Sequence, residues 1–149
     1  MTIRAFQDRD MDAITEIYAL SKLDELRYET GEFELLPLMQ DEVRLRELME
    51  SEIFVYDDGG VLGYGAVFEN EIRSLFVHPQ SRGKGIGKSL LEHLISQVGK
   101  PATLYVAKSN APAKAMYQKY GFAVTKEFEA FYNGKPVLAN QMVRCTRST

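Results

Sequence analysis

Apolar residues recur at helical spacing in three segments of the chain. The first follows Asp8 and Asp10, either of which can cap a helix, and the second covers residues 41–51. The third segment, SLLEHLISQV at residues 89–98, has apolar side chains on one face and polar ones on the other. A further helix is predicted over residues 110–120, so the pattern indicates about four helices.

β-Branched and aromatic residues gather in shorter runs, which is typical of strands. The predicted strands cover residues 2–6, three runs within 53–77, residues 102–107, about 122–130 and about 136–144. Tight turns at residues 57–60 and 69–70 make the three middle runs antiparallel. The order of strand, helix and strand implies a right-handed crossover to a parallel neighbour. We therefore predict an α/β domain with a mixed sheet and helices on both faces.

Length and composition agree with one domain, and we take residues 1–149 as a single unit. Hydrophobic residues make up 45% of the chain, which is enough for a core. No run of about 18 apolar residues predicts a membrane span, and the polar start of the chain predicts no signal peptide. The single cysteine, Cys145, cannot form an internal disulfide. These features predict a soluble cytoplasmic protein.

Charge is distributed unevenly along the chain. The net charge is −3, but residues 1–58 carry −10 and residues 59–149 carry +7. The basic part would attract a polyanionic ligand, although acidic surface helices that simply come first would give the same asymmetry. Duplex nucleic acid is a poor partner, because the chain as a whole would repel it.

A glycine cluster, PQSRGKGIGKS at residues 79–89, lies in the basic part between a predicted strand and a predicted helix. Such a junction binds anions, because the free N–H groups of the first helical turn converge there. The cluster does not match a P-loop, since the first glycine of that motif would fall on Arg82. It does not match the dinucleotide fingerprint, since the last glycine would fall on Lys88. A nucleotide-hydrolysing protein is therefore not predicted.

The cluster satisfies a third pattern, Gln/Arg-x-x-Gly-x-Gly/Ala, through Arg82, Gly85 and Gly87, directly after LFVHP at residues 75–79. This arrangement resembles the acetyl-coenzyme A site of the GNAT N-acetyltransferase superfamily. The resemblance implies a mixed, mostly antiparallel central sheet of six to seven strands with about four helices on both faces. The alternative is a glycine-rich turn that binds no ligand.

The resemblance also implies acetyl-coenzyme A as the co-substrate. Its diphosphate would lie on the amides of residues 83–88, and its pantetheine arm would pair with the preceding strand. In the family that strand splays away from its parallel neighbour, here residues 102–107, and a backbone donor in the gap polarises the thioester carbonyl. The implied cofactor-binding residues on the strand and the loop are Leu75, Phe76, Val77, Arg82, Gly83, Lys84, Gly85, Ile86, Gly87 and Lys88.

A second motif, NAPAKAMYQKYGF at residues 110–122, resembles the other cofactor-side motif of the family. Asn110 is a good helix N-cap, Tyr117 lies on the same helical face two turns later, and Gly121 is placed to end the helix. The resemblance implies that Asn110 contacts the pantetheine arm and that Tyr117 stands near the thioester sulfur. A phenol of pKa about 10 is protonated at neutral pH and can protonate the departing thiolate. The alternative is a core tyrosine like Tyr120.

A general base must accept the proton of the attacking amine. Glu71, at the start of the strand EIRSLFV, matches the glutamate that serves as base in histone-acetylating members of the family. Strand alternation would place it on one face with Arg73, Leu75 and Val77. Other members use a water chain or a different residue, and Glu71 would be a solvated hairpin residue in that case. The weaker candidates for the base are Ser74, His78 and Glu25.

Histidine and cysteine suggest no other chemistry. Neither His78 nor His93 belongs to a metal-ligand spacing, so both are interpreted as structural and no metal is expected. Cys145 lacks a partnering histidine. Transfer in the family is direct, which also argues against a covalent enzyme intermediate.

The acceptor side lies outside the two motifs. Aromatic residues and acids there indicate a cationic amine with some apolar body, and the acids are Asp24, Glu25, Glu29, Glu32 and Glu34. The leading hypothesis is an enzyme that moves an acetyl group from acetyl-coenzyme A to a primary amine of a small molecule or peptide. The alternative is a non-catalytic acyl-coenzyme A sensor or interaction module. A monomer and a homodimer both stay open, since an exposed final strand could pair with another copy.

Overall fold

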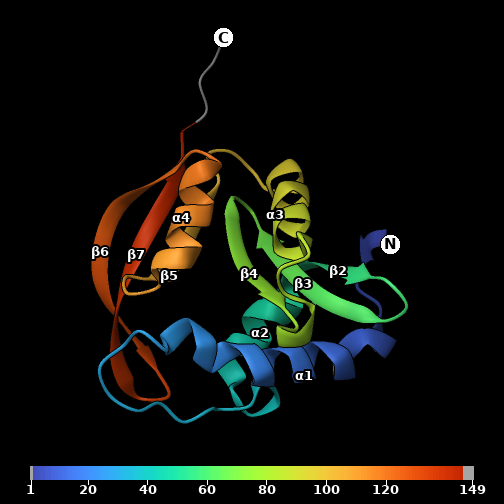
Figure 1. Ribbon diagram of the computed structural model, residues 1–149, viewed down its shortest axis with the longest axis horizontal. Helices are drawn as coiled ribbons and strands as arrows, with labels where there is room; N and C mark the ends of the chain where they lie inside the picture. The colour runs from blue at the N-terminus through green and yellow to red at the C-terminus, as the bar shows by residue number, and fades with distance from the viewer. Residues whose placement is uncertain (1, 146–149) are drawn as a thin grey trace.

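The computed structural model describes residues 2–145, which form one mixed seven-stranded sheet (Figure 1). The strands are β1 (Thr2–Ala5), β2 (Glu52–Asp57), β3 (Val61–Phe68), β4 (Glu71–Val77), β5 (Thr103–Ala107), β6 (Phe122–Tyr132) and β7 (Lys135–Arg144). They follow the order β1-β2-β3-β4-β5-β7-β6, and every neighbouring pair except β4 and β5 is antiparallel. The fold class predicted from the sequence is confirmed.

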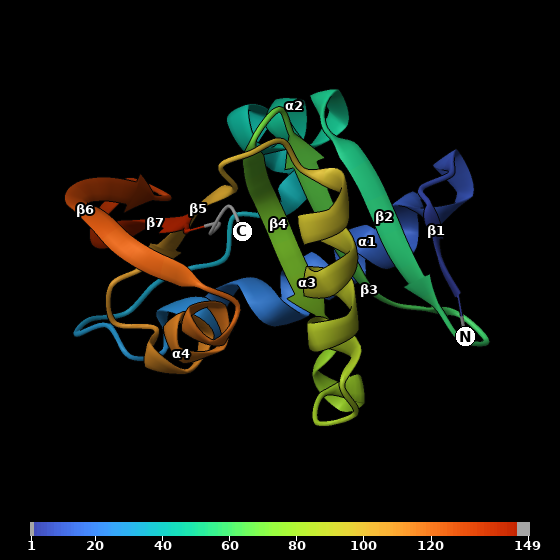
Figure 2. The ribbon, with the colours of Figure 1, turned by 90° about the horizontal axis from the view of Figure 1, so that it is seen from above.

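Helices cover both faces of the sheet (Figure 2). The α-helices are α1 (Met11–Ser21), α2 (Glu42–Glu50), α3 (Ile86–Gln97) and α4 (Ala111–Lys119), and the short 3-10 helices are η1 (Asp8–Asp10), η2 (Lys22–Leu26), η3 (Leu38–Gln40) and η4 (Pro79–Ser81). The two views place α1 and α2 on one side of the sheet and α3 and α4 on the other. No helix within residues 2–145 is both long and apolar enough to span a bilayer.

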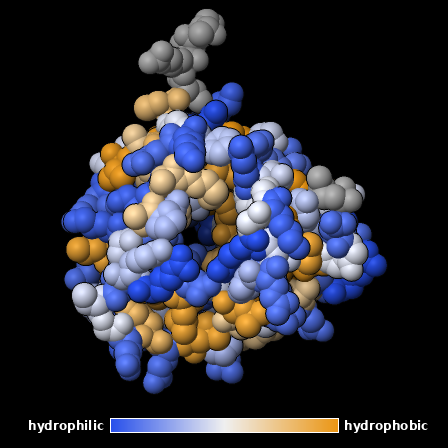
Figure 3. Space-filling view, in the orientation of Figure 1, coloured by the Kyte–Doolittle hydropathy of each residue, from blue (hydrophilic) through white to orange (hydrophobic). Residues whose placement is uncertain are grey.

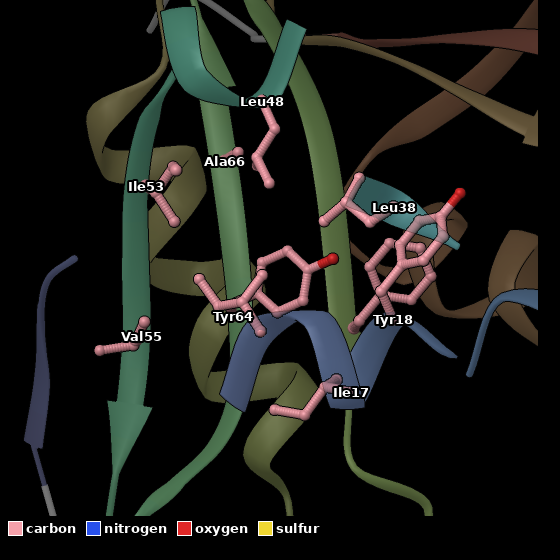
Figure 4. Close-up of a cluster of buried hydrophobic side chains, with 10 residues drawn as sticks. Ile17, Tyr18, Leu38, Leu48, Ile53, Val55, Tyr64 and Ala66 are labelled. Carbon is pink, nitrogen blue, oxygen red and sulfur yellow. The ribbon is translucent and has the colours of Figure 1, made fainter. Parts of the chain in front are cut away.

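Alternation along β2 sends its side chains into two separate cores. Val55 packs with Ile17 and Tyr64 in the cluster under α1 (Figure 4), whereas Phe54 packs with Leu94 in the cluster under α3. Fully burying an apolar side chain of this size stabilises the fold by about 1.5–3 kcal/mol. Apolar packing on both faces therefore stabilises the sheet and fixes the positions of its strands.

The parallel pair β4 and β5 is joined over a very short distance. Glu71 pairs with Thr103 and Ile72 pairs with Leu104, and beyond these residues the two strands separate (Figure 1). Helix α3 connects them, as the predicted crossover requires. We call the opening beyond Ile72 and Leu104 the β4–β5 gap. It agrees with the splayed strands that the resemblance implied.

A bulge in β4 changes which side chains share a face. Ala66 of β3 pairs with Ser74, but Val67 pairs with Ile72, so Arg73 is an extra residue in β4. One consequence is that the side chains of Leu75 and Val77 pack on the α3 side of the sheet.

Glu71 and Arg73 lie on the opposite side of the sheet from Leu75 and Val77. Arg73 donates to the Glu47 carbonyl (3.0 Å) of α2, and its Nε atom is 3.5 Å from the Glu71 carboxylate. The expectation that all four side chains share one face is therefore wrong. The physical reason is the bulge, because one extra residue reverses the alternation beyond it.

Candidate active site

The loop between β4 and α3 presents unbonded backbone amides. Gly83 and Gly85 are left-handed, with φ of 81° and 82°, and a Cβ at either position would meet nothing within 4 Å. The first helical hydrogen bond of α3 runs from the Ser89 N–H to the Gly85 carbonyl (3.0 Å). Within residues 2–145, the N–H groups of residues 83–88 donate no hydrogen bond. Six amides at a helix start are thus available to an anion.

A cleft of about 590 Å³ extends from this loop, past β4, β5 and α4, to the hairpin of β6 and β7. Figure 3 shows a hollow near the centre of the face on which Figure 1 shows β4 and β5 diverging. All of the predicted cofactor-binding residues line the cleft except Lys84. Those that line it are Leu75, Phe76, Val77, Arg82, Gly83, Gly85, Ile86, Gly87, Lys88, Asn110 and Tyr117.

Arg82 is engaged with the opposite wall of the cleft. Its Nη1 atom donates to the Asp24 carboxylate at 2.6 Å, and its Nε atom donates to the Val77 carbonyl at 3.3 Å. Asp24 therefore offsets the positive charge of Arg82 at the glycine loop. Lys88, in the first turn of α3, forms no ion pair within residues 2–145 and lines the cleft. It is the cation best placed to act on an anion at the loop.

Asn110 and Tyr117 reach the cleft from α4. Asn110 precedes the first residue of α4, but its side chain makes no capping hydrogen bond, so its amide is left for a ligand. Tyr117 packs edge-on against Phe122, with ring centroids 6.0 Å apart, and its hydroxyl makes no hydrogen bond within residues 2–145. Burial raises the pKa of Tyr117, and Glu25 adds to the shift. The phenol therefore stays protonated well above neutral pH. Gly121, at φ 90°, ends the helix as predicted.

Both motifs fall inside one recognised domain. Residues 49–124, about half of the chain, match the family profile of the acetyltransferase (GNAT) domain. The chain belongs to the GNAT family. The matched region contains both the glycine loop and α4.

Individual proteins are similar to parts of this chain. The cysteine-rich protein 2-binding protein of Homo sapiens is 44% identical over 66 residues, which are 44% of this chain and 8% of that protein. The peptidyl-lysine N-acetyltransferase YjaB of Salmonella typhimurium is 34% identical over 84 residues, which are 56% of this chain and 57% of that one. The chain thus spans less than two thirds of either relative.

One solved structure extends the similarity to almost the whole chain. It is a GNAT phosphinothricin acetyltransferase from Sinorhizobium meliloti in complex with AcCoA. The TM-score is 0.68 at 26% identity, over 96% of this chain and 86% of that one. The elements outside the matched domain therefore follow the GNAT arrangement as well.

A second, smaller cavity of about 160 Å³ adjoins the cleft on the α1–α2 side of this GNAT sheet. The two cavities share Leu75 and Phe76 of β4 and Tyr105 of β5, so they meet at the β4–β5 gap. Polar side chains from α1, η2, α2 and β4 line the smaller cavity, among them Tyr18, Glu25, Arg44, Glu47, Arg73 and Ser74. No sequence motif marks it, because its walls come from segments far apart in the chain.

The residues proposed as general base occupy different places. Glu71 lies at the closed end of the β4–β5 pair and lines neither cavity. Burial raises its pKa, against the opposing effect of Arg73. Glu25 of η2 lines both cavities, where its carboxylate accepts a hydrogen bond from Lys22 at 2.9 Å. Ser74 lines the smaller cavity alone.

The acceptor end of the cleft is less acidic than the sequence indicated. Of the five acids expected there, only Asp24 and Glu25 line the cleft, and both are in ion pairs of 2.6 and 2.9 Å. The other three line neither cavity, and the Glu29 carboxylate accepts a hydrogen bond from Ser109. Cations outnumber acids along the cleft, namely Lys22, Arg27, Arg44, Arg82 and Lys88.

The histidines have structural contacts. The Nδ1 atom of His78 accepts a hydrogen bond from the Gln80 N–H (3.1 Å), and His93 packs edge-on against Phe54 at 4.5 Å between ring centroids. Cys145 is exposed and free. Among the described side chains, no group of three or more His, Cys, Asp or Glu is placed to hold a metal ion.

Proposed function

We propose that this GNAT domain transfers the acetyl group of acetyl-coenzyme A to a primary amine. The observation that carries the proposal is the loop at residues 83–88, whose six amides donate no hydrogen bond within residues 2–145 and whose residues other than Lys84 line the cleft that also holds Tyr117. Convergent amides at a helix start suit a diphosphate. Beyond Ile72, β4 does not pair with β5, so the main chain of Leu75 and Phe76 on that side is open to the pantetheine arm. The Val77 carbonyl accepts hydrogen bonds from Arg82 and Ser21.

Direct attack uses the side chains that the cleft brings together. The amine nitrogen bonds to the thioester carbon, the carbon–sulfur bond breaks, and the sulfur leaves as a thiolate. Tyr117 donates its proton to that sulfur. The proton lost by the amine goes to a carboxylate, and Glu25 is the candidate that lines the cleft. Glu71, which lies outside the cleft, would need a chain of waters to serve the same role.

The developing negative charge on the thioester oxygen needs a donor. Backbone N–H groups of β4 that face the β4–β5 gap are suited to this, because no strand pairs with them on that side beyond Ile72. Such a donor is worth about 2.7–4 kcal/mol of transition-state stabilisation in other acyl-transfer enzymes. The similarity to a peptidyl-lysine N-acetyltransferase makes a lysine side chain the first acceptor to test.

A coenzyme-binding module without catalysis is the second candidate. It needs the amides of residues 83–88 but no proton donor at the sulfur. Tyr117 lines the cleft, and its hydroxyl makes no hydrogen bond within residues 2–145. This free proton donor favours an enzymatic function over binding alone.

Calorimetry followed by a thiol-release assay separates the candidates. We expect the protein to bind acetyl-coenzyme A but not ATP, and to release free thiol only when an amine acceptor is present. Binding without amine-dependent release, across lysine peptides, polyamines, amino acids and aminoglycosides, would support the sensor. Failure to bind acetyl-coenzyme A at all would refute both.

A further inference from the structure

Two cations lie where the cleft and the smaller cavity meet. Lys22 and Arg44 line both cavities. Both lie against the ring of Tyr132, with Lys22 Nζ 5.3 Å and Arg44 Cζ 5.0 Å from its centroid. Tyr132 is buried, and its hydroxyl accepts a hydrogen bond from the Leu36 N–H at 2.8 Å. The ring is therefore a fixed platform against which both cations lie.

Arg44 has hydrogen-bond donors to spare. Its Nη1 atom donates to the Asp41 carboxylate at 3.1 Å, whereas its Nε and Nη2 atoms have no partner within residues 2–145. A guanidinium group presents its N–H donors as a planar fork that matches the two oxygens of a carboxylate. Because Arg44 lines both cavities, these spare donors are within reach of a ligand at the junction.

Tyr18 provides an independent sign of a ligand. Its side chain is 4% exposed and lines the smaller cavity, and its hydroxyl has no hydrogen-bond partner within residues 2–145. Figure 4 shows the hydroxyl at the edge of the apolar cluster, pointing away from the side chains around it. A buried hydroxyl without a partner is costly, so such a group points to a polar ligand that satisfies it.

One cation of the smaller cavity keeps donors that can bind an anion. Its lining contains the charged residues Lys22, Arg44, Arg73, Glu25 and Glu47. Lys22 is paired with Glu25, and Arg73 is paired with carboxylates of α2 and β4, whereas Arg44 is paired through its Nη1 atom alone. Its volume of about 160 Å³ admits a group of a few heavy atoms but no folded peptide segment. A carboxylate with a short stem fits both the spare donors of Arg44 and the space.

We infer that the acceptor is a free α-amino acid or a close analogue, whose carboxylate is bound by Arg44 and the Tyr18 hydroxyl. This inference rests on the proposed function and names its substrate class. Glu25, the proposed base, accepts a hydrogen bond from Lys22. Lys22 and Arg44 both lie against the Tyr132 ring, so the carboxylate site at Arg44 is close to the base. An amine one carbon away from the carboxylate would then lie at the junction, beside the thioester. A peptide lysine would leave the spare donors of Arg44 without an anion.

The substrate test compares each free amino acid with its own carboxamide. We expect at least one amino acid to be acetylated with a kcat/KM about tenfold or more above that of its carboxamide, as for loss of a hydrogen bond to a charged group. The amine of the carboxamide is the less basic of the two, so amine ionisation cannot produce this preference. A lysine peptide blocked at both ends is the third substrate.

Variants assign the preference to the two side chains. Tyr18→Phe and Arg44→Lys should each raise the KM for the amino acid about tenfold, and leave the carboxamide KM and the acetyl-coenzyme A Kd unchanged. Tyr18→Phe should also leave the melting temperature unchanged or higher, because it removes an unpartnered buried hydroxyl. Arg46→Lys is the matched control, since Arg46 lies on the same helix and is exposed.

Each remaining outcome is decisive. Equal kcat/KM for acids and carboxamides, or variants that shift both KM values by the same factor, would overturn the inference and show that the hydroxyl is satisfied by water. If acetyl-coenzyme A binds and the blocked lysine peptide is acetylated while no amino acid is, the proposed function stands and the inference falls. If acetyl-coenzyme A does not bind, both fall.

Discussion

Gly85 and Gly87, two residues of the glycine loop, differ in backbone conformation. Gly85 has φ 82° and ψ 9°, a left-handed conformation that costs an L-residue about 1–2 kcal/mol. A Cβ at Gly85 would meet no atom within 4 Å, so the whole cost of Gly85→Ala comes from the backbone. We therefore expect Gly85→Ala to lower the free energy of unfolding by about 1–2 kcal/mol.

Gly87 lies in the first turn of α3 and has no such conformational need. A Cβ there would lie 3.5 Å from Val77 Cγ2, which is ordinary van der Waals contact. Alanine is favoured over glycine in a helix by about 0.5–1 kcal/mol, so Gly87→Ala should raise the free energy of unfolding by up to that amount. The same methyl group, added two residues apart, is thus expected to change stability in opposite directions.

Urea unfolding and calorimetric titration with acetyl-coenzyme A measure the two effects together. Gly85→Ala should weaken binding about tenfold or more, because a strained residue re-aims the amides, and each hydrogen bond to a charged group is worth about 1.5–3 kcal/mol. Gly87→Ala should bind with a Kd within about threefold of the wild type, since the family pattern accepts alanine there and the helical backbone is unchanged.

Two results would refute this reasoning. If Gly85→Ala is destabilised but binds acetyl-coenzyme A as tightly as the wild type, the amides of residues 83–88 do not hold the diphosphate. If Gly87→Ala is destabilised as much as Gly85→Ala, the loop is constrained by something other than backbone conformation.

Four further substitutions test the roles assigned to side chains in and near the cleft. Tyr117→Phe should lower kcat about 100-fold in the thiol-release assay with acetyl-coenzyme A affinity within twofold, and unchanged turnover would remove Tyr117 from the mechanism. Because burial raises its pKa, wild-type activity should show no loss near pH 10 from this group. Glu25→Gln should lower kcat/KM about 100-fold in the same assay, because the proposed proton acceptor is removed. Glu71→Gln should keep kcat/KM within about twofold of the wild type, and a loss at Glu71 instead would identify that carboxyl, whose pKa is raised by burial, as the base. Asp24→Asn should free Arg82 and tighten acetyl-coenzyme A binding up to about fivefold at low salt, and an unchanged Kd would show that Arg82 does not act on the diphosphate.

Local signals in the sequence predicted the strands and helices well, because each depends on neighbours in the chain. The turn between β6 and β7 falls on Asn133-Gly134, a pair typical of tight hairpins, and both residues have positive φ, 49° and 80°. The glycine loop was predicted for the same kind of reason, since its amides are left free by backbone conformation at consecutive residues. A motif of this kind carries its own geometry, so it can be identified without knowledge of the rest of the fold.

Features that depend on distant parts of the chain were not predicted. The ion pair of Arg82 with Asp24 joins residues 58 positions apart, and no local pattern indicates it. The smaller cavity depends on how α1 and α2 pack against β4. The sequence also indicated an acidic acceptor end. That expectation came from a count of acids, which cannot show that Glu25 accepts a hydrogen bond from Lys22.

The bulge in β4 accounts for the β4–β5 gap. Ile72 is the last residue of β4 that pairs with β5, and Arg73, directly after it, is the extra residue in the pairing with β3. A bulge increases the local twist of its strand, so β4 turns away from β5 at the residue where the bulge occurs. The extra residue also places the Leu75 side chain on the α3 side of the sheet, whereas the Arg73 side chain lies on the α2 side. One extra residue thus opens the sheet between the cleft and the smaller cavity, and the proposed transfer would use this opening for the amine to reach the thioester.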